Sequence, residues 1–154
     1  MRETLSGRPN HLRTLAQRLP DWLYRQLPDR VRLPEGIMQR RRANIVIFCP
    51  DDESVLRSII DAASEAGAGA YQEYTKVAFI QSQVIGNWQA SENAHPYQGV
   101  AGVESRENCA IIGMTCPQKR KVIDRVVTAV IAVHPWEEPV IHVFPVKEYS
   151  RPNK

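Results

Sequence analysis

Cysteine and long apolar stretches are both scarce in this chain of 154 residues, and each scarcity excludes a class of protein. Three cysteines without a CxxC spacing are too few, and too odd in number, for a disulfide framework. No apolar run is long enough to cross a bilayer, and the N-terminus lacks the apolar core of a secretory signal. We therefore expect a cytoplasmic protein in which Cys49, Cys109 and Cys116 are buried, reduced thiols.

Excess positive charge is confined to one end of the chain. Residues 1–43 contain ten arginines and four acidic residues, a net charge of +6, whereas the remainder has a net charge of −3. The basic character of the whole chain therefore belongs to its N-terminal part. The rest is mildly acidic, so we do not expect the core of the protein to bind nucleic acid or a membrane.

Residues 1–43 are interrupted by prolines at positions 9, 20, 28 and 34. Proline breaks helices, so we expect no more than a short, kinked amphipathic helix over residues 11–27. We interpret this basic segment as a flexible or loosely docked extension. The alternative is an arm that binds a membrane surface, RNA or a protein partner.

Residues 44–148 alternate between strand-like and helical patterns of apolar residues, and residues 149–154 form a short tail. The pattern predicts, in order, a strand over 45–49, a helix between Asp52 and Gly67, strands over 71–84 and 109–116, a helix from Pro117 that carries apolar residues at 122–131, and a strand over 140–146. This β-α-β-β-α-β order is typical of a ferredoxin-like α+β fold. Right-handed crossovers place both helices on one face of a four-stranded antiparallel sheet.

The first predicted strand is apolar on both of its faces. Ile45, Ile47 and Cys49 point to one face, while Val46 and Phe48 point to the other. Strands of this kind are usually covered on both faces, and two helices cover only one. We therefore expect the second face to be buried against other copies of the chain, in a homo-oligomer.

Several short motifs occur in a defined order along the predicted domain. They are Gly67-Ala68-Gly69, Tyr74, Phe79, Asn93-Ala94-His95-Pro96 with Gly99 and Gly102, and His134-Pro135-Trp136-Glu137-Glu138-Pro139. Together they resemble the PII-like, CutA-like domain inserted in the NIF-three-like (YqfO-type) proteins, over about residues 44–148. The last motif is also similar to a segment that precedes the final strand of the CutA divalent-cation tolerance proteins.

This resemblance implies a PII-like fold that assembles as a trimer. It does not imply an enzyme, because the metal site of the full-length NIF-three-like family lies in flanking domains whose histidines and acids this chain lacks. No arrangement of serine, histidine, cysteine and aspartate in the sequence indicates nucleophilic catalysis either. We expect a non-catalytic protein.

The segment 134–139 is predicted to be a rigid corner, because Pro135 ends the preceding helix and Pro139 restricts the backbone before the last strand. His134, Glu137 and Glu138 offer nitrogen and oxygen ligands for a divalent metal such as zinc or copper, with help from His95 or His142. In the alternative interpretation, which we favour, His134 bonds to backbone at the helix end and Glu137 pairs with an arginine or lysine.

The stretch from Gly86 to Gly102 is the second candidate site. Trp88, Asn93, His95 and Tyr97 lie between its glycines, and loops held by a sheet often carry binding residues. These side chains are candidates for contact with a small molecule or a protein partner. The alternative is that Trp88 and Tyr97 pack over the sheet edge or against a neighbouring subunit.

Gly67 and Gly69 are interpreted as conformational residues at the end of the first helix. A phosphate would favour the N-terminus of a helix instead, so this motif does not indicate a phosphate loop.

Taken together, the sequence favours a trimeric PII-like module for ligand sensing, regulation or scaffolding. The alternative function is divalent-metal binding of the CutA kind.

Overall fold

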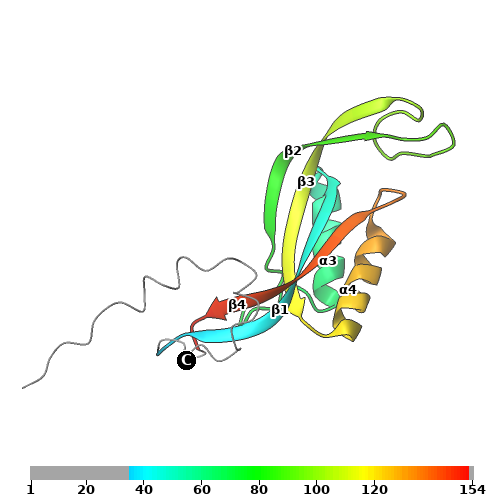
Figure 1. Ribbon diagram of the computed structural model, residues 1–154. Coiled ribbons are helices and arrows are strands. Elements are labelled where there is room, and N and C mark those ends of the chain that lie inside the picture. Colours follow the sequence, from blue (N-terminus) through cyan, green and yellow to red (C-terminus); the bar gives the residue numbers. More distant parts are fainter. Residues whose placement is uncertain (1–34, 153–154) are drawn as a thin grey trace, which may run out of the picture. The chain divides into compact units, whose positions relative to one another are not determined.

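The computed structural model describes residues 35–152, so the helix predicted over residues 11–27 lies outside the described part. Four antiparallel strands form one sheet in the order β2-β3-β1-β4 (Figure 1). The elements are β1 (Met38–Pro50), α3 (Glu53–Glu65), β2 (Phe79–Gln89), β3 (Glu104–Pro117), α4 (Arg120–Val133) and β4 (Val140–Ser150). The predicted ferredoxin-like α+β fold is confirmed.

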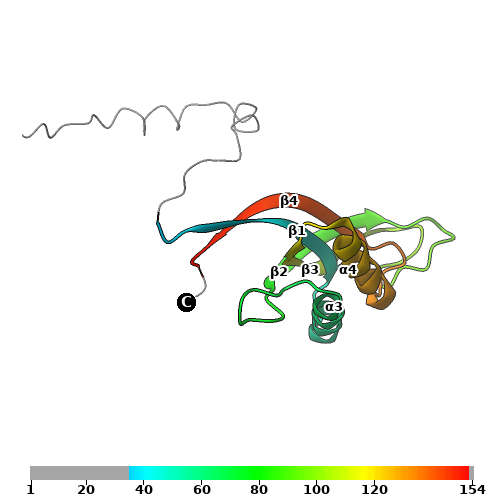
Figure 2. The same cartoon turned by 90° about the horizontal axis from the view of Figure 1, so that it is seen from below.

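Both helices cover the same face of the sheet, as the view from below shows (Figure 2). Ile45 and Ile47 of β1 and Ile112 of β3 are fully buried in the core beneath them. From the helices, Ile59 and Val126 complete this layer and are also inaccessible to solvent. Within residues 35–152, no helix covers the opposite face of the sheet, which is here called the open face. No helix within residues 35–152 is long and apolar enough to span a membrane.

The ends of α3 follow the predicted capping chemistry. The Asp52 carboxylate accepts hydrogen bonds from the backbone N–H groups of Ser54 (2.9 Å) and Val55 (3.1 Å), and bonds to the Ser54 hydroxyl and to these groups lower the pKa of Asp52. Gly67 follows the helix with φ of 110°. Gly69 has φ of 65°, and a Cβ there would lie 2.7 Å from the terminal methyl of Met114.

The third predicted segment, a strand over residues 71–84, is wrong at both ends. Tyr71 and Tyr74 exchange backbone hydrogen bonds of 2.8 and 2.9 Å across a tight turn. Gln72 and Lys76 have positive φ, which is incompatible with a continuous strand. The strand therefore begins at Phe79 and continues to Gln89, so Gly86 and Trp88 are strand residues.

The other strands are longer than their apolar cores indicated. β1 begins at Met38, before the expected boundary at Asn44, and β4 continues to Ser150, which pairs with Met38. β3 begins at Glu104, and its polar residues pair with β2 in an exposed hairpin. Pro117 ends β3, whereas the sequence placed it in the first turn of α4. These added segments are mostly polar and carry no apolar alternation, so the pattern could not reveal them.

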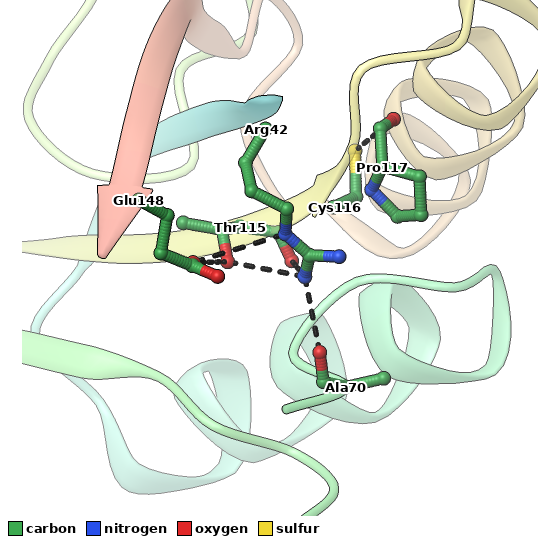
Figure 3. Close-up of polar contacts among 6 residues, drawn as sticks. All are labelled: Arg42, Ala70, Thr115, Cys116, Pro117 and Glu148. Carbon is green, nitrogen blue, oxygen red and sulfur yellow. Dashed lines mark hydrogen bonds and ion pairs between the residues drawn. The ribbon is translucent and has the colours of Figure 1, made fainter. Parts of the chain in front are cut away.

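One arginine joins three strands to the chain that follows α3 (Figure 3). The Nη2 group of Arg42 donates to the carbonyl oxygens of Ala70 (3.0 Å) and Thr115 (3.2 Å) and to the Thr115 hydroxyl (3.2 Å). Glu148 of β4 accepts from the Thr115 hydroxyl at 3.1 Å and lies 3.8 Å from Arg42 Nε. The side chains of Arg42 and Glu148 are only 10% and 16% exposed, so each charge needs the other to offset the cost of its burial.

We expect Arg42→Met to lower the free energy of unfolding by about 2–4 kcal/mol, because it removes three hydrogen bonds and leaves Glu148 buried without its cation. Urea unfolding followed by circular dichroism measures this change. Arg57→Met is the matched control, since the Arg57–Glu53 pair is 71% and 81% exposed. Exposed pairs contribute less than about 1 kcal/mol. Equal losses in the two variants would contradict the role given to Arg42.

Candidate aromatic groove

The end of the β2–β3 hairpin and the corner between α4 and β4 lie at the same end of the sheet (Figure 1). Between them is a groove of about 620 Å³. Its lining residues include Phe48, Val84, Trp88, Tyr97, Gln98, Cys109, Trp136, Glu137, Glu138 and Val140. The two candidate sites identified in the sequence, the corner and the stretch 86–102, thus form opposite walls of one groove.

His134 fixes the corner by using both nitrogens of its ring. Nε2 lies 2.9 Å from the carbonyl oxygen of Phe48, and Nδ1 accepts the backbone N–H of Trp136 at 3.1 Å. Since Nδ1 is an acceptor, the ring proton is on Nε2 and donates to Phe48. Burial lowers the pKa of His134, and the bond to Phe48 opposes this shift only in part. The His134 side chain therefore binds the backbone, as in the interpretation that we favoured.

Trp136 connects the corner to the hairpin. Its ring centroid lies 6.0 Å from that of Trp88 in β2 and 5.2 Å from that of His134. Its indole N–H faces the Gln98 side-chain oxygen at 3.4 Å. One aromatic side chain therefore contacts the hairpin strand, the loop and the corner. From the sequence, Trp136 was identified as part of the corner but without a role.

Glu137 makes a second connection between the two walls. Its carboxylate accepts the backbone N–H of His95 at 3.0 Å and lies 3.9 Å from Nδ1 of the same residue. The prediction that an arginine or lysine pairs with Glu137 is wrong, because the loop supplies His95 instead. Glu138 lines the groove beside it, and makes no hydrogen bond or ion pair within residues 35–152.

The four residues proposed for the loop are placed differently from one another. Trp88 and Tyr97 line the groove, with Trp88 packed on Trp136 and Tyr97 53% exposed. The His95 side chain is 90% exposed, and this residue joins the corner mainly through its backbone. Asn93 is exposed and does not line the groove. Both interpretations of Trp88, packing and ligand contact, are compatible with its position.

Two glycines allow the hairpin to carry its bulky side chains. A Cβ on Gly86 would lie 2.7 Å from Cys109 Sγ and 2.9 Å from the Trp88 ring. A Cβ on Gly99, where φ is 82°, would lie 2.7 Å from Ser105 Cβ. The glycine two positions before Trp88 was therefore a usable signal that this ring packs over Gly86 within a strand rather than projecting from a loop.

The proposed metal ligands do not assemble into a metal centre in the described chain. Within residues 35–152, no group of three or more histidine, cysteine or acidic side chains is placed to hold an ion. His134 has both ring nitrogens engaged, and His142 packs edge-on against Phe48 and Phe144 instead of facing the corner. Zinc or copper binding by His134, Glu137 and Glu138 stays a hypothesis with no geometry to support it.

The three cysteines are free and buried, as expected. Burial raises the pKa of Cys49 to about 12 and also raises the pKa values of Cys109 and Cys116. Neutral thiols behave as small apolar groups. Cys109 therefore contributes an apolar part of the groove wall.

No protein-family model matches this chain, and no curated protein matches it. Among solved structures, a Bacillus cereus protein related to NIF3 matches with a TM-score of 0.57 and 21% identity, over 74% of this chain and 28% of that one. CutA1 from Oryza sativa matches with a TM-score of 0.50 and 14% identity, over 71% and 84%. The chain thus spans little more than a quarter of the Bacillus protein. These likenesses show a fold of the kind that the sequence motifs resembled.

The lowered pKa of His134 predicts how the stability of the fold depends on pH. Above about pH 6.5 the ring is neutral in both the folded and the unfolded chain. As the pH decreases below this value, the unfolded chain takes up a proton before the folded chain does, so the free energy of unfolding decreases. We expect His134→Gln to lose about 1–3 kcal/mol at pH 8 through its missing hydrogen bonds. We also expect a flatter decline in stability below about pH 6.5.

Urea unfolding at a series of pH values measures both effects. His95→Gln is the matched control, because that side chain is 90% exposed. It should retain the decline of the unaltered protein. Parallel curves for His134→Gln and the unaltered protein below pH 6.5 would show that His134 is not held neutral by the fold.

Proposed function

We propose that the chain is a non-catalytic PII-like module that senses a small molecule or protein partner through the aromatic groove, acts as a homotrimer and resides in the cytoplasm. The observation that carries this proposal is the meeting of the hairpin and the corner around one groove. The PII-like and CutA-like fold also supports this proposal, which requires no catalytic group.

The groove offers a physical means of sensing. The hairpin and the corner are joined by contacts of Trp88 with Trp136, Gln98 with Trp136, and His95 with Glu137. Most of these residues also line the groove. A ligand that contacts these residues binds one orientation of the hairpin better than another, and so it changes the populations of these orientations. The exposed loop 90–103 then presents that change to a partner.

The open face of the sheet supports assembly. Val46 and Ile111 are only half-buried there, and Phe144 is 49% exposed; these three residues lie outside the groove lining. Phe79, at the edge of the sheet, is 79% exposed. Two more copies of the chain cover this apolar surface and protect the sheet edges in the proposed trimer.

Divalent-metal binding is the second candidate function. His95 Nδ1 and the Glu137 carboxylate lie 3.9 Å apart at the rim of the groove, with Glu138 next in the chain. A shift of a few tenths of an ångström would let both donors face one ion, and a neighbouring copy would have to supply further ligands. His134 takes no part in this version, because its nitrogens are engaged.

Native mass spectrometry of the full chain, purified without a chelator, tests the proposal. We expect a trimer mass for the unaltered protein and loss of the trimer in Phe144→Glu, which places a charge on the open face. Ile131→Glu is the matched control, since Ile131 of α4 is 51% exposed on the helical layer. It should remain trimeric. A monomer at micromolar concentration in the unaltered protein would contradict the proposed assembly, and a stoichiometric metal would favour the second function.

A further inference from the structure

We propose that the aromatic groove binds an organic cation, an ammonium or guanidinium group attached to an apolar body. This inference rests on the proposed function, because it names the ligand class of the same groove. It depends on three properties of the lining: its aromatic surface, its charge and its apolar interior.

The aromatic surface suits a cation. The indole rings of Trp88 and Trp136 meet at 52° with centroids 6.0 Å apart, and the phenol ring of Tyr97 is exposed beside them. The electron-rich face of an indole attracts cations more strongly than that of any other side chain. The Trp136 indole is directed by Gln98, and its backbone is held by His134, so little ordering accompanies binding.

The charge of the groove selects the sign of the ligand. Among the groove-lining residues within 35–152, Glu137 and Glu138 are the only charged side chains, and none is lysine or arginine. Glu137 is partly satisfied by His95, whereas Glu138 makes no hydrogen bond or ion pair within residues 35–152. A phosphate or carboxylate ligand would meet two like charges and no cation here. An ammonium group gains a carboxylate partner and aromatic faces together.

The size and interior of the groove indicate the rest of the ligand. A volume of about 620 Å³ exceeds that of a simple ammonium head group and lies within the usual range for small-molecule sites. Phe48, Val84, Cys109 and Val140 provide apolar surface in the same groove. The ligand is therefore expected to have an apolar portion that packs on the sheet while its cationic end faces the carboxylates.

A pair of probes that differ only in charge tests this inference on the full chain. Choline carries a quaternary nitrogen where 3,3-dimethyl-1-butanol has a neutral carbon, and the two have nearly the same shape. In titrations followed by NMR, we expect choline to shift the indole N–H signals of Trp88 and Trp136. We expect it to bind about three- to thirtyfold more tightly than the alcohol.

Two variants locate the binding. Glu138→Gln, which removes the free carboxylate, is expected to weaken choline binding about three- to tenfold, and Trp136→Leu about three- to thirtyfold. Glu65→Gln, at the exposed end of α3, makes the same change in net charge outside the groove and should have no effect. If Trp136→Leu loses the native spectrum, Tyr97→Leu replaces it, since Tyr97 is 53% exposed.

Equal affinities for choline and the alcohol would overturn the inference, and so would absence of shifts at the two indoles. An equal loss of affinity in Glu65→Gln and Glu138→Gln would also overturn it, because binding would then follow net charge alone. These failures are distinct from failure of the proposed function. A trimer that binds no cation leaves the module and its assembly intact, whereas a monomer that binds choline at the indoles leaves the ligand class intact.

Discussion

The imidazole of His134 is the contact on which the candidate site depends. It links the carbonyl of Phe48, near the end of β1, to the backbone N–H of Trp136, just after α4. These two bonds turn the chain sharply between α4 and β4 and hold the turn against the sheet. They add to the direct contacts that Trp136 and Glu137 make with the hairpin.

The corner in turn supports the long β2–β3 hairpin through direct contacts. Within the described residues, no helix packs on the outer part of the β2–β3 hairpin, and Ile85 and Tyr97 are more than half exposed. Its contacts with Trp136 and Glu137 are an indole pair, an indole–amide contact and a carboxylate–backbone bond. Each is weak enough to respond to a ligand, so the segment with the least packing is also the one that the groove can control.

The core of the fold could be predicted because burial leaves a pattern in the sequence. Alternation at Ile45 and Ile47, and helical spacing at Val122, Val126 and Val130, specify which faces meet. The hairpin bounds could not be predicted, because its residues face solvent and follow no such pattern. The turn at Tyr71 and Tyr74 was missed for the opposite reason, since aromatic residues there imitate a strand.

The site was predicted in its parts but not in its arrangement. The corner and the hairpin were both identified, yet nothing local to either indicates that Trp88 packs on Trp136 or that His95 pairs with Glu137. Whether His134 binds a metal or the backbone depends on Phe48, which lies far away in the sequence. Side-chain contacts between distant segments are determined by the tertiary fold, and one sequence does not display them.

The state of the His134 ring tests this account most directly. Long-range proton–nitrogen NMR correlations distinguish the two neutral tautomers and the charged ring. We expect a neutral ring protonated on Nε2, which stays neutral below about pH 6.5 because burial lowers its pKa. A ring protonated on Nδ1, or one that gains its proton at or above pH 6.5, would contradict it, because His134 would then not be the anchor of the corner.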